Sequence, residues 1–364
     1  MIEVAKKTGV KEKIACCPTV GDYDIVTDIL LKECLGYKTI HCPPVTKRTL
    51  ELGERHSPDM VCTPFKMSLG SLIEAAEKGA NVLVMPGVVC RLGFFDILQK
   101  QILEDLGYDC EMLILFDYIP TMASMYEELR VINPDLNQEH YYHIVAILLR
   151  IAFDKDHLAD FVRRNAAFEV NKGSYDKLYN AYLQEAGQSK SAAEAESIFK
   201  KYKEKMESVA INKPERSIRV GVMGEIYTSI VPFANRNLEK WFIERGVEII
   251  RPVDWSSAGV AVFSLPEVIK NSGGYASYNI GSTANDVIAQ AHQMMKDGID
   301  GIIHLKPATC SPEITGMSIL QTMSADFNVP VMYMTFDTTT SETGVHTRFE
   351  AFYDMIVAKR GMQK

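Results

Sequence analysis

Cysteines are the residues of this chain best suited to do chemistry, and there are eight of them. Six stand at or just after the end of a short apolar run, namely Cys16, Cys17, Cys42, Cys62, Cys90 and Cys310. Ligand sites in a parallel sheet lie just beyond the carboxyl ends of its strands, so these thiols are expected along such edges. Cys34, within an amphipathic helix, and Cys110, at the start of a strand, are expected to be core thiols, because free cysteine is often buried.

Three of these thiols precede an expected helix. Cys62 lies in "VCTPFK", Cys90 in "VVCRLG" and Cys310 in "ATCSPE". The partial positive charge of a helix N-terminus lowers the pKa of a thiol and stabilises a thiolate or an anionic cluster. Thiolates suit zinc and iron–sulfur clusters, but the chain has neither a C-x2-C pair nor a ferredoxin run. From the residues alone, a metal site and scattered buried cysteines both remain open.

Other polar residues accompany these thiols. Glu225 and Tyr227, in "GEIYT", are expected at the carboxyl end of a strand, where they would contact a substrate or position a proton. A structural Glu225 that binds the next helix is the alternative. His304 is expected to be a core histidine, and Glu313 a first-turn helix residue favoured by the helix dipole. Lys66 would offset negative charge or hold an anionic substrate, or else it would lie in solvent.

The elements that must position these residues follow from the hydrophobic pattern. Strands are expected at 13–17, 37–42, 59–62, 80–87, 111–116, 219–227, 247–253, 300–305 and 330–337. Helices are expected at 21–35, 46–55, 66–78, 94–107, 234–245, 284–297, 312–326 and 345–360. Short apolar runs that alternate with longer amphipathic ones indicate βαβ units and parallel sheets.

Between the two alternating parts, residues 122–209 are rich in helix formers and have few strand signals. A length of 364 residues suggests about two domains. The pattern predicts an α/β protein with two Rossmann- or flavodoxin-like parallel-sheet domains, at residues 1–121 and 215–364. Residues 122–214 would be a helical linker or insertion that joins them. Ser191 or Ser189 is expected near the start of its last helix.

Composition, charge and motifs argue against several partners, cofactors and cellular locations. The formal net charge is -8 and no basic patch is present, which argues against nucleic acid. The apolar runs fall short of the roughly 20 residues that span a bilayer, and no secretory signal is recognisable. We therefore expect a cytoplasmic protein without a membrane segment. "GVMGE" lacks the full G-x-G-x-x-G pattern and no Walker A motif occurs, so we expect neither NAD nor ATP to bind this chain.

A family resemblance joins these features. The segment from "CPPVTKRTLELG" to "CRLGFFDILQKQILEDLGY", with C-x-P-x-K at Cys62–Lys66 and CR-x-G at Cys90–Gly93, resembles the 2-hydroxyacyl-CoA dehydratase-like family. "GEIYT", "HLKPATCSPE" and the closing "FDTTTSETGVHTRFEAF" extend the resemblance to the second half. It is nearest to the short branch that is related to the C-terminal parts of CoA-substrate-specific enzyme activases. Double-cubane cluster proteins are among its relatives.

The resemblance implies a cofactor and its ligands. Cys62, Cys90 and Cys310 would hold a [4Fe–4S] cluster between the two domains and leave one iron open. The alternative is a double-cubane [8Fe–9S] cluster, which needs more thiols. The further candidates for that cluster are Cys42, Cys16 and Cys17.

The resemblance also implies partners. A separate dimeric ATPase activator, with its own [4Fe–4S] cluster, would supply low-potential electrons, so that ATP is used only by the partner. The chain would form a homodimer, or a heterodimer with a related subunit, and carry out reductive or dehydration chemistry on a small molecule. The substrate stays open, and whether the chain is itself an enzyme is uncertain, although the resemblance favours an iron–sulfur reductase or dehydratase subunit. A non-enzymatic electron carrier or cluster scaffold is one alternative, and a metal-free or zinc two-lobed ligand-binding protein is another.

Overall fold

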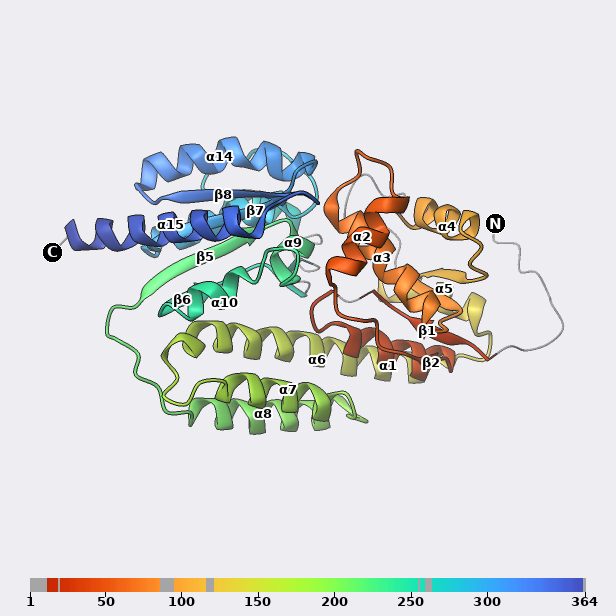
Figure 1. The fold of residues 1–364 in the computed structure, drawn as a ribbon. Coiled ribbons are helices and arrows are strands. Elements are labelled where there is room, and N and C mark those ends of the chain that lie inside the picture. Colours follow the sequence, from red (N-terminus) through yellow and green to blue (C-terminus); the bar gives the residue numbers. More distant parts are fainter. Residues whose placement is uncertain are drawn as a thin grey trace.

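A computed structural model describes residues 12–18, 20–85, 95–115, 121–254, 256–258 and 264–362. Two α/β lobes lie side by side, and a group of long helices lies below them (Figure 1). We call the described residues up to 115 the first lobe, residues 121–209 the helical segment, and residues 218–362 the second lobe. Among the described residues, no helix combines the length and the apolar character needed to cross a membrane.

The first lobe is built on a sheet of four parallel strands. These are β1 (Ile14–Cys16), β2 (Lys38–Thr39), β3 (Val82–Met85) and β4 (Glu111–Ile114), in the order β2-β1-β3-β4. Its helices are α1 (Asp24–Leu35), α2 (Lys47–His56), α3 (Thr63–Glu77) and α4 (Phe95–Asp105). The predicted alternation of strands and helices is therefore confirmed in this lobe, except at one place.

The strand predicted at residues 59–62 is wrong. The chain forms a turn there between α2 and α3, and Met60 is 81% exposed, so the short apolar run is not buried. Pro58 favours a turn at this point, because its φ is fixed and it has no N–H to donate to a sheet. Cys62 is consequently not the last residue of a strand but the N-cap of α3, which begins at Thr63.

Close packing of α2 against α3 sets the position of this N-cap. A Cβ atom built on Gly70 of α3 would stand 1.9 Å from the backbone oxygen of Thr49 in α2. Only glycine allows two helix backbones to approach this closely. The N-terminal end of α3, with Cys62, is thereby held beside α2 at the edge of the first lobe that faces the second lobe (Figure 1).

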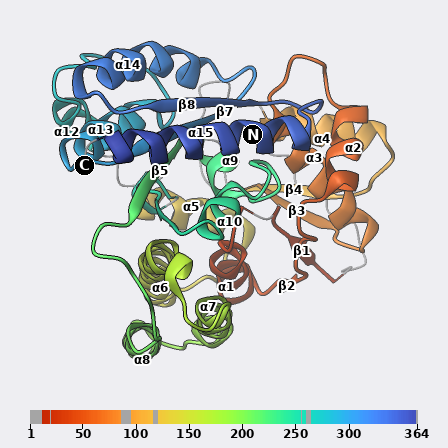
Figure 2. The same cartoon turned by 60° about the vertical axis from the view of Figure 1, so that its left-hand side comes forward.

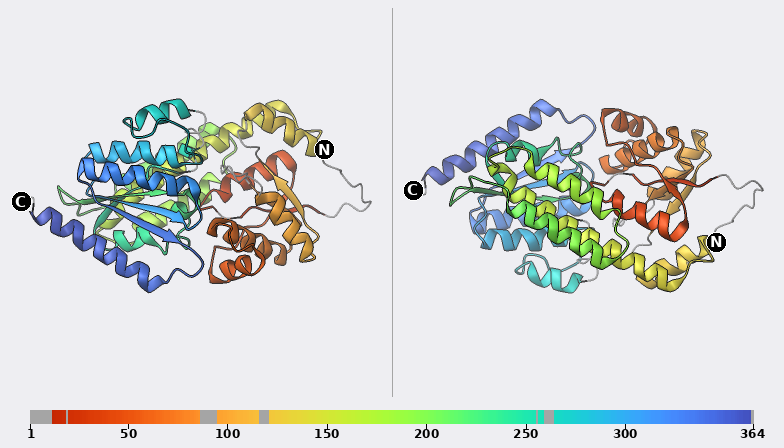
Figure 3. Two further views of the ribbon diagram at one scale, coloured as in Figure 1. Left: turned by 90° about the horizontal axis from the view of Figure 1, so that it is seen from above. Right: turned by 90° about the horizontal axis from the view of Figure 1, so that it is seen from below.

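The helical segment packs on the first sheet and also reaches the second lobe. Its elements are α5 (Met122–Ile132), α6 (Gln138–Asn165), a 3-10 turn (Ala166–Phe168), α7 (Ser174–Ala186) and α8 (Ala192–Glu207). Ile144 and Ile151 of α6 share a core with Ala15 and Val82 of the first sheet. The 28 residues of α6 extend about 42 Å at a rise of 1.5 Å per residue. This helix therefore runs below both lobes (Figure 3).

The cap predicted for the last of these helices is confirmed at one of its two candidates. The hydroxyl oxygen of Ser191 accepts a hydrogen bond from the backbone N–H of Glu194, with an oxygen–nitrogen distance of 3.1 Å. Ser189 precedes this cap and is buried. Satisfying a free N–H in the first turn in this way stabilises the start of a helix.

The second lobe repeats the strand order of the first. Its parallel strands are β5 (Ile218–Gly224), β6 (Val247–Ile250), β7 (Gly301–Pro307) and β8 (Val331–Phe336), in the order β6-β5-β7-β8. Its helices are α9 (Ile226–Ile230), α10 (Leu238–Ile243), α12 (Leu265–Asn271), α13 (Ala284–Lys296), α14 (Ser311–Phe327) and α15 (Glu342–Met362). One core joins α13 and α14 to the sheet and another joins α10 and α15 to it, so that α14 and α15 flank β8 (Figure 2). Two parallel sheets covered by helices confirm the predicted pair of Rossmann- or flavodoxin-like domains.

The strand predicted at residues 219–227 ends earlier than expected, at Gly224. This glycine has a φ of 135°, and a Cβ atom on it would stand 2.0 Å from the backbone oxygen of Leu305 in β7. A backbone in this conformation leaves the extended path of a strand, and side chains other than glycine rarely adopt it. Glu225 and Tyr227 therefore belong to the start of a short helix, α9, rather than to the strand.

A buried carboxyl in α13 makes the stability of this lobe depend on pH. Asp286 is 6% exposed, and its Oδ2 atom has no hydrogen-bond partner among the described residues. Burial raises the pKa of Asp286 from 3.8 to about 6. Because the folded state then holds the proton more tightly than the unfolded state does, the contribution of Asp286 to stability improves as the pH falls from 7 to 4.

We expect Asp286→Asn to raise the free energy of unfolding at pH 7 by about 1–3 kcal/mol, since each unit of pKa shift corresponds to roughly 1.4 kcal/mol. The variant should also lose the part of the pH dependence between pH 7 and pH 4 that Asp286 causes. Urea unfolding at a series of pH values measures both effects. Asp297→Asn, at the exposed end of the same helix, is the matched control. Parallel profiles for the wild type and Asp286→Asn would contradict the prediction.

Candidate functional site

The carboxyl ends of the two sheets face each other across the boundary between the lobes. The hydroxyl of Thr63, at the start of α3, donates a hydrogen bond to the backbone oxygen of Phe336, at the end of β8, over 3.4 Å. The hydroxyl of Thr338 binds the carboxylate of Glu54 at the same boundary. In each lobe, the first strand of the sheet lies next to the third. The chain leaves these two strands in opposite directions, and a parallel sheet has its ligand crevice at such a point. The boundary therefore joins the two crevices.

An apolar cluster holds this boundary together. Leu50 of α2 and Met67 of α3 pack with Tyr227 of α9 and with Val231 and Ala234, which follow it. Apolar area that is removed from water on both sides of a boundary contributes roughly 25 cal/mol per Å² to its stability. The side chains of α2 and α3 are thereby held against α9, which begins at the carboxyl end of β5.

Cys62 and Cys310 approach each other across this boundary. Cys62 is the N-cap of α3 and Cys310 the N-cap of α14, each helix has a proline in its first turn, and both thiols are half-buried. Burial raises the pKa of the Cys310 thiol, and the negative charges of Glu313, Glu225 and Cys62 raise it further. The residue after Cys62, Thr63, and Ala308, two residues before Cys310, both donate to the backbone oxygen of Phe336, at 3.4 and 2.9 Å, so the two thiols lie near each other. The predicted position of both thiols just ahead of helices is confirmed.

Cys90, the third predicted cluster ligand, lies in residues 86–94, outside the described residues. It follows β3, which is the third strand of its sheet, as Cys310 follows β7, the third strand of the other sheet. Within the described part of the chain, no group of three or more His, Cys, Asp or Glu residues is placed to hold a metal ion. Of the three predicted ligands, the structure therefore describes only Cys62 and Cys310.

Three other thiols gather at the carboxyl end of the first sheet. Cys16 and Cys17 take part in different cores, on the two faces of the sheet, as their adjacent positions in a strand predict. A hydrogen bond with the Cys42 side chain is the main cause that raises the pKa of Cys16, followed by burial. Burial also raises the pKa of Cys17 to about 12. Cys16 and Cys42 are therefore in contact, and Cys17 lies in the core on the other face of the sheet.

The two cysteines expected in the core differ in burial. Cys34 is 0% exposed in the core between the first sheet and the helical segment, which confirms the expectation. Cys110 is half-buried beside the core of the first lobe, and its thiol donates a hydrogen bond to the backbone oxygen of Ala80 over 3.5 Å. Neither thiol stands at a carboxyl end of a strand.

Glu225 caps α9. Its carboxylate accepts hydrogen bonds from the backbone N–H of Tyr227 at 3.0 Å, the backbone N–H of Thr228 at 2.8 Å and the hydroxyl of Thr228 at 2.6 Å. This is the structural arrangement that the sequence left open as an alternative. Burial is the main cause that raises the Glu225 pKa, and the charge of Glu313 contributes to the rise.

Tyr227 faces the boundary with a phenol that has no hydrogen-bond partner among the described residues. Its side chain is buried, and burial raises its pKa, as do the nearby Cys42 and Glu225. A buried hydroxyl without a partner is unfavourable by about 1–3 kcal/mol.

The sequence did not reveal that buried polar residues contact each other close to Cys310. His304 in β7 and Glu313 in α14 are completely buried, and the His304 Nε2 and Glu313 Oε2 atoms are 2.7 Å apart. The histidine was expected in the core, which is confirmed, but its pairing with Glu313 was not foreseen. Lys306 was not singled out either, although it stands in the same "HLKPATCSPE" segment. Lys66 is buried and lies 3.8 Å from Glu54, so of the alternatives left open for it, the solvated one is wrong.

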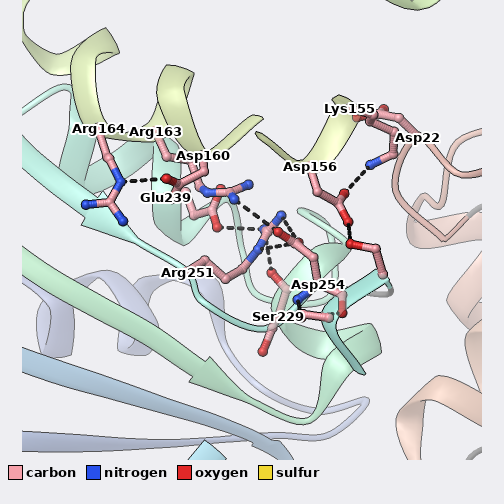
Figure 4. Close-up of polar contacts among 12 residues, drawn as sticks. Asp22, Lys155, Asp156, Asp160, Arg163, Arg164, Ser229, Glu239, Arg251 and Asp254 are labelled. Atoms are coloured by element: carbon pink, nitrogen blue, oxygen red, sulfur yellow. Dashed lines mark hydrogen bonds and ion pairs between the residues drawn. The ribbon is translucent and has the colours of Figure 1, made fainter. Parts of the chain in front are cut away.

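A second polar cluster, also missed, ties α6 to the second lobe (Figure 4). Arg163 of α6 donates to Asp254, with a distance of 3.1 Å, and Asp254 also accepts two hydrogen bonds from Arg251. Arg251 donates in addition to Glu239 over 2.7 Å. On the same helix, Asp156 accepts hydrogen bonds from the hydroxyls of Tyr23 and Ser256, which come from the two lobes, and from Lys155 over 3.1 Å. We call these residues the α6 network.

The fold and its facing thiols define a two-lobed α/β protein with cysteines at the strand ends of both lobes. Comparison with protein-family models gives the family. Residues 29–253, more than half of the chain, match the CoA enzyme activase uncharacterised domain (DUF2229). The chain belongs to this family, and its resemblance to CoA-substrate activase C-terminal parts is confirmed. No curated protein matches the chain. The matched segment contains Cys62 and Cys90, and it ends before Cys310.

Proposed function

We propose that this protein is an iron–sulfur protein in which Cys62, Cys90 and Cys310 hold a [4Fe–4S] cluster between the two lobes. The observation that carries the proposal is the approach of Cys62 and Cys310, thiols that are 248 positions apart in the chain and cap two helices on opposite sides of one boundary. Membership of an activase-related family agrees with it. When bound, the cluster would supply one-electron reduction and a Lewis-acidic iron for a small molecule.

The donor set fits such a group chemically. Cys62 and Cys310 each stand at the N-terminus of a helix, where the partial positive charge favours an anionic cluster. Burial and nearby negative charge raise the pKa of Cys310, so its proton has to leave when a metal binds, as it does for cysteine ligands in general. Because the ligands come from both lobes, binding would also stabilise the contact between the lobes.

The surrounding residues have separate tasks in this proposal. Glu225 fixes the start of α9 by its three hydrogen bonds, and so it acts as a positioning residue. Tyr227 presents its unpaired phenol at the boundary and would donate a hydrogen bond or a proton to the substrate. Water is kept from this side by the apolar cluster around Leu50 and Met67. Cys16 and Cys42 would join the ligand set only if the cluster were the larger [8Fe–9S] form.

The proposal includes a partner. Electrons of sufficiently low potential would come from a dimeric ATPase activator with its own [4Fe–4S] cluster, since neither an NAD nor an ATP motif occurs in this chain. A dimer, with a second copy or with a related subunit, belongs to the proposal as well. A reducing cytoplasm is the compartment in which free thiols and such a cluster persist.

Anaerobic reconstitution with ferrous iron and sulfide tests the proposal. We expect about four iron and four sulfide per chain, a brown colour and an electron paramagnetic resonance signal after reduction. About eight iron per chain would favour the double cubane instead. A protein that takes up only zinc, or no metal, would overturn the proposal.

A further inference from the structure

Lys306 differs from the other buried cations of this protein. In the described part of the chain, the buried lysine and arginine side chains are Lys66, Lys155, Arg163, Arg251 and Lys306. The first four lie within 4 Å of a carboxylate, at distances of 3.8, 3.1, 3.1 and 2.7 Å. Lys306 is 6% exposed, and no described carboxylate lies within ion-pair distance of its ammonium group. The ammonium nitrogen is not among the fully buried polar atoms of the described residues, so it reaches solvent and can receive an anion from there.

The strand geometry directs Lys306 toward the start of α14. Side chains two residues apart in a strand point to the same face, so Lys306 lies on the face of β7 that carries His304. His304 contacts Glu313 in the first turn of α14, which shows that this face looks toward that helix. The charges of Cys310 and Glu313 act on Lys306, although burial lowers its pKa overall. The ammonium group and the N-terminus of α14 are therefore neighbours.

We propose that Lys306 and the N-terminal turn of α14 form a binding site for a small monocarboxylate. The inference rests on the proposed function, because it names the class of substrate at the same lobe boundary. The carboxylate of the ligand would receive hydrogen bonds from the Lys306 ammonium, and the helix N-terminus of this 17-residue helix would add its partial positive charge. Lys306 would thus place the substrate next to Cys310.

The balance of charge selects a ligand with one negative charge. A single ammonium and a helix N-terminus, which is equivalent to about half an elementary charge, match one carboxylate. Glu313 and Glu225 lie on the same side and oppose a second negative charge. A phosphate or sulfate dianion is therefore disfavoured at this place, as is a neutral amide, which lacks the charge that would pair with the buried lysine.

Calorimetric titration of the full metal-free chain with propionate tests this inference, with sulfate and propionamide as control ligands. We expect saturable binding of propionate and at least about tenfold weaker binding of both controls, as the loss of one charge-assisted hydrogen bond would give. Lys306→Met should weaken propionate binding at least about tenfold, and Lys306→Arg should keep most of it. Lys296→Met, at an exposed position in the last turn of α13, should leave it unchanged.

The variants are expected to fold, because Lys306→Met removes a buried charge and breaks no ion pair. Circular dichroism and thermal unfolding check this, and Lys306→Gln provides a second neutral variant. Equal binding of propionate by the wild type and both neutral variants would overturn the inference, and so would sulfate binding as tight as propionate binding.

Iron uptake, measured on the same samples, separates the two proposals. Loss of iron uptake in Lys306→Met, together with no propionate binding by the wild type, would assign Lys306 to the cluster and overturn the carboxylate site. Propionate binding by a chain that takes up no iron would leave the carboxylate site standing and remove the cluster.

Discussion

Replacing Cys310 with alanine is expected to reduce the iron bound after anaerobic reconstitution from about four to below about one per chain. The reason is that Cys310 is the second lobe's thiol at the lobe boundary, so its removal leaves a cluster with ligands from one lobe only. Cys62→Ala is expected to have the same effect, because Cys62 is the described thiol that faces it from the first lobe. Iron and sulfide analysis with visible absorbance measures the loss.

Loss of folding would be a trivial cause of this result, and the structure argues against it. The Cys310 side chain makes no capping hydrogen bond to α14, so the alanine variant should lose less than about 1 kcal/mol of stability. Cys34→Ala is the matched control, since Cys34 lies in the core beside the helical segment and should leave the iron content unchanged. Full iron content in both Cys62→Ala and Cys310→Ala would exclude these thiols as ligands.

Replacing Asp254 with alanine is expected to lower the free energy of unfolding by about 3–5 kcal/mol. Asp254 is the carboxylate that Arg163 and Arg251 share in the α6 network (Figure 4). Burial opposes its charge, yet these neighbouring cations hold its pKa below the usual value. Without it, two buried guanidinium groups lose a partner, and a buried charge left unpaired is far more costly than a missing surface ion pair.

Urea unfolding at pH 7 measures this effect. Asp160→Ala on α6 is the matched control, because the pair of Asp160 with Arg164 is partly exposed and is worth at most about 1 kcal/mol. A loss of stability at Asp254 no larger than at Asp160 would contradict the role assigned to the α6 network. The same variant also checks the site, because a weaker contact between α6 and the second lobe should loosen the boundary that carries Cys62 and Cys310.

Most of the secondary structure was predictable from the periodicity of apolar residues. The strand expected at 330–337 is β8, and the helix expected at 312–326 is α14, each within one residue at either end. The two strand predictions that the structure corrects share a physical reason. The run at 59–62 is apolar but too short to be buried, and the strand at 219–227 is ended by a glycine in contact with β7. Burial and close backbone contacts depend on neighbours that are distant in sequence.

The candidate site, like the fold, was predictable from the sequence only in part. Cysteine followed by threonine or serine and then proline is a local signal for the start of a helix, and it located both Cys62 and Cys310 correctly. No local signal showed that Glu225 would cap α9 or that Lys306 would be buried without an ion pair. The partners of these residues, or the lack of them, are set by strands and helices that meet only in the folded chain.

By itself, the sequence of this protein determined the alternating elements, the two parallel sheets and the thiols at strand ends and helix starts, because these follow from side-chain periodicity and turn residues within a few positions. The tertiary structure alone decided that Cys62 lies near Cys310, that His304 binds Glu313, and that α6 ties the two lobes together. These contacts join residues on different strands, helices and lobes, and their distances result from packing and burial across the whole chain.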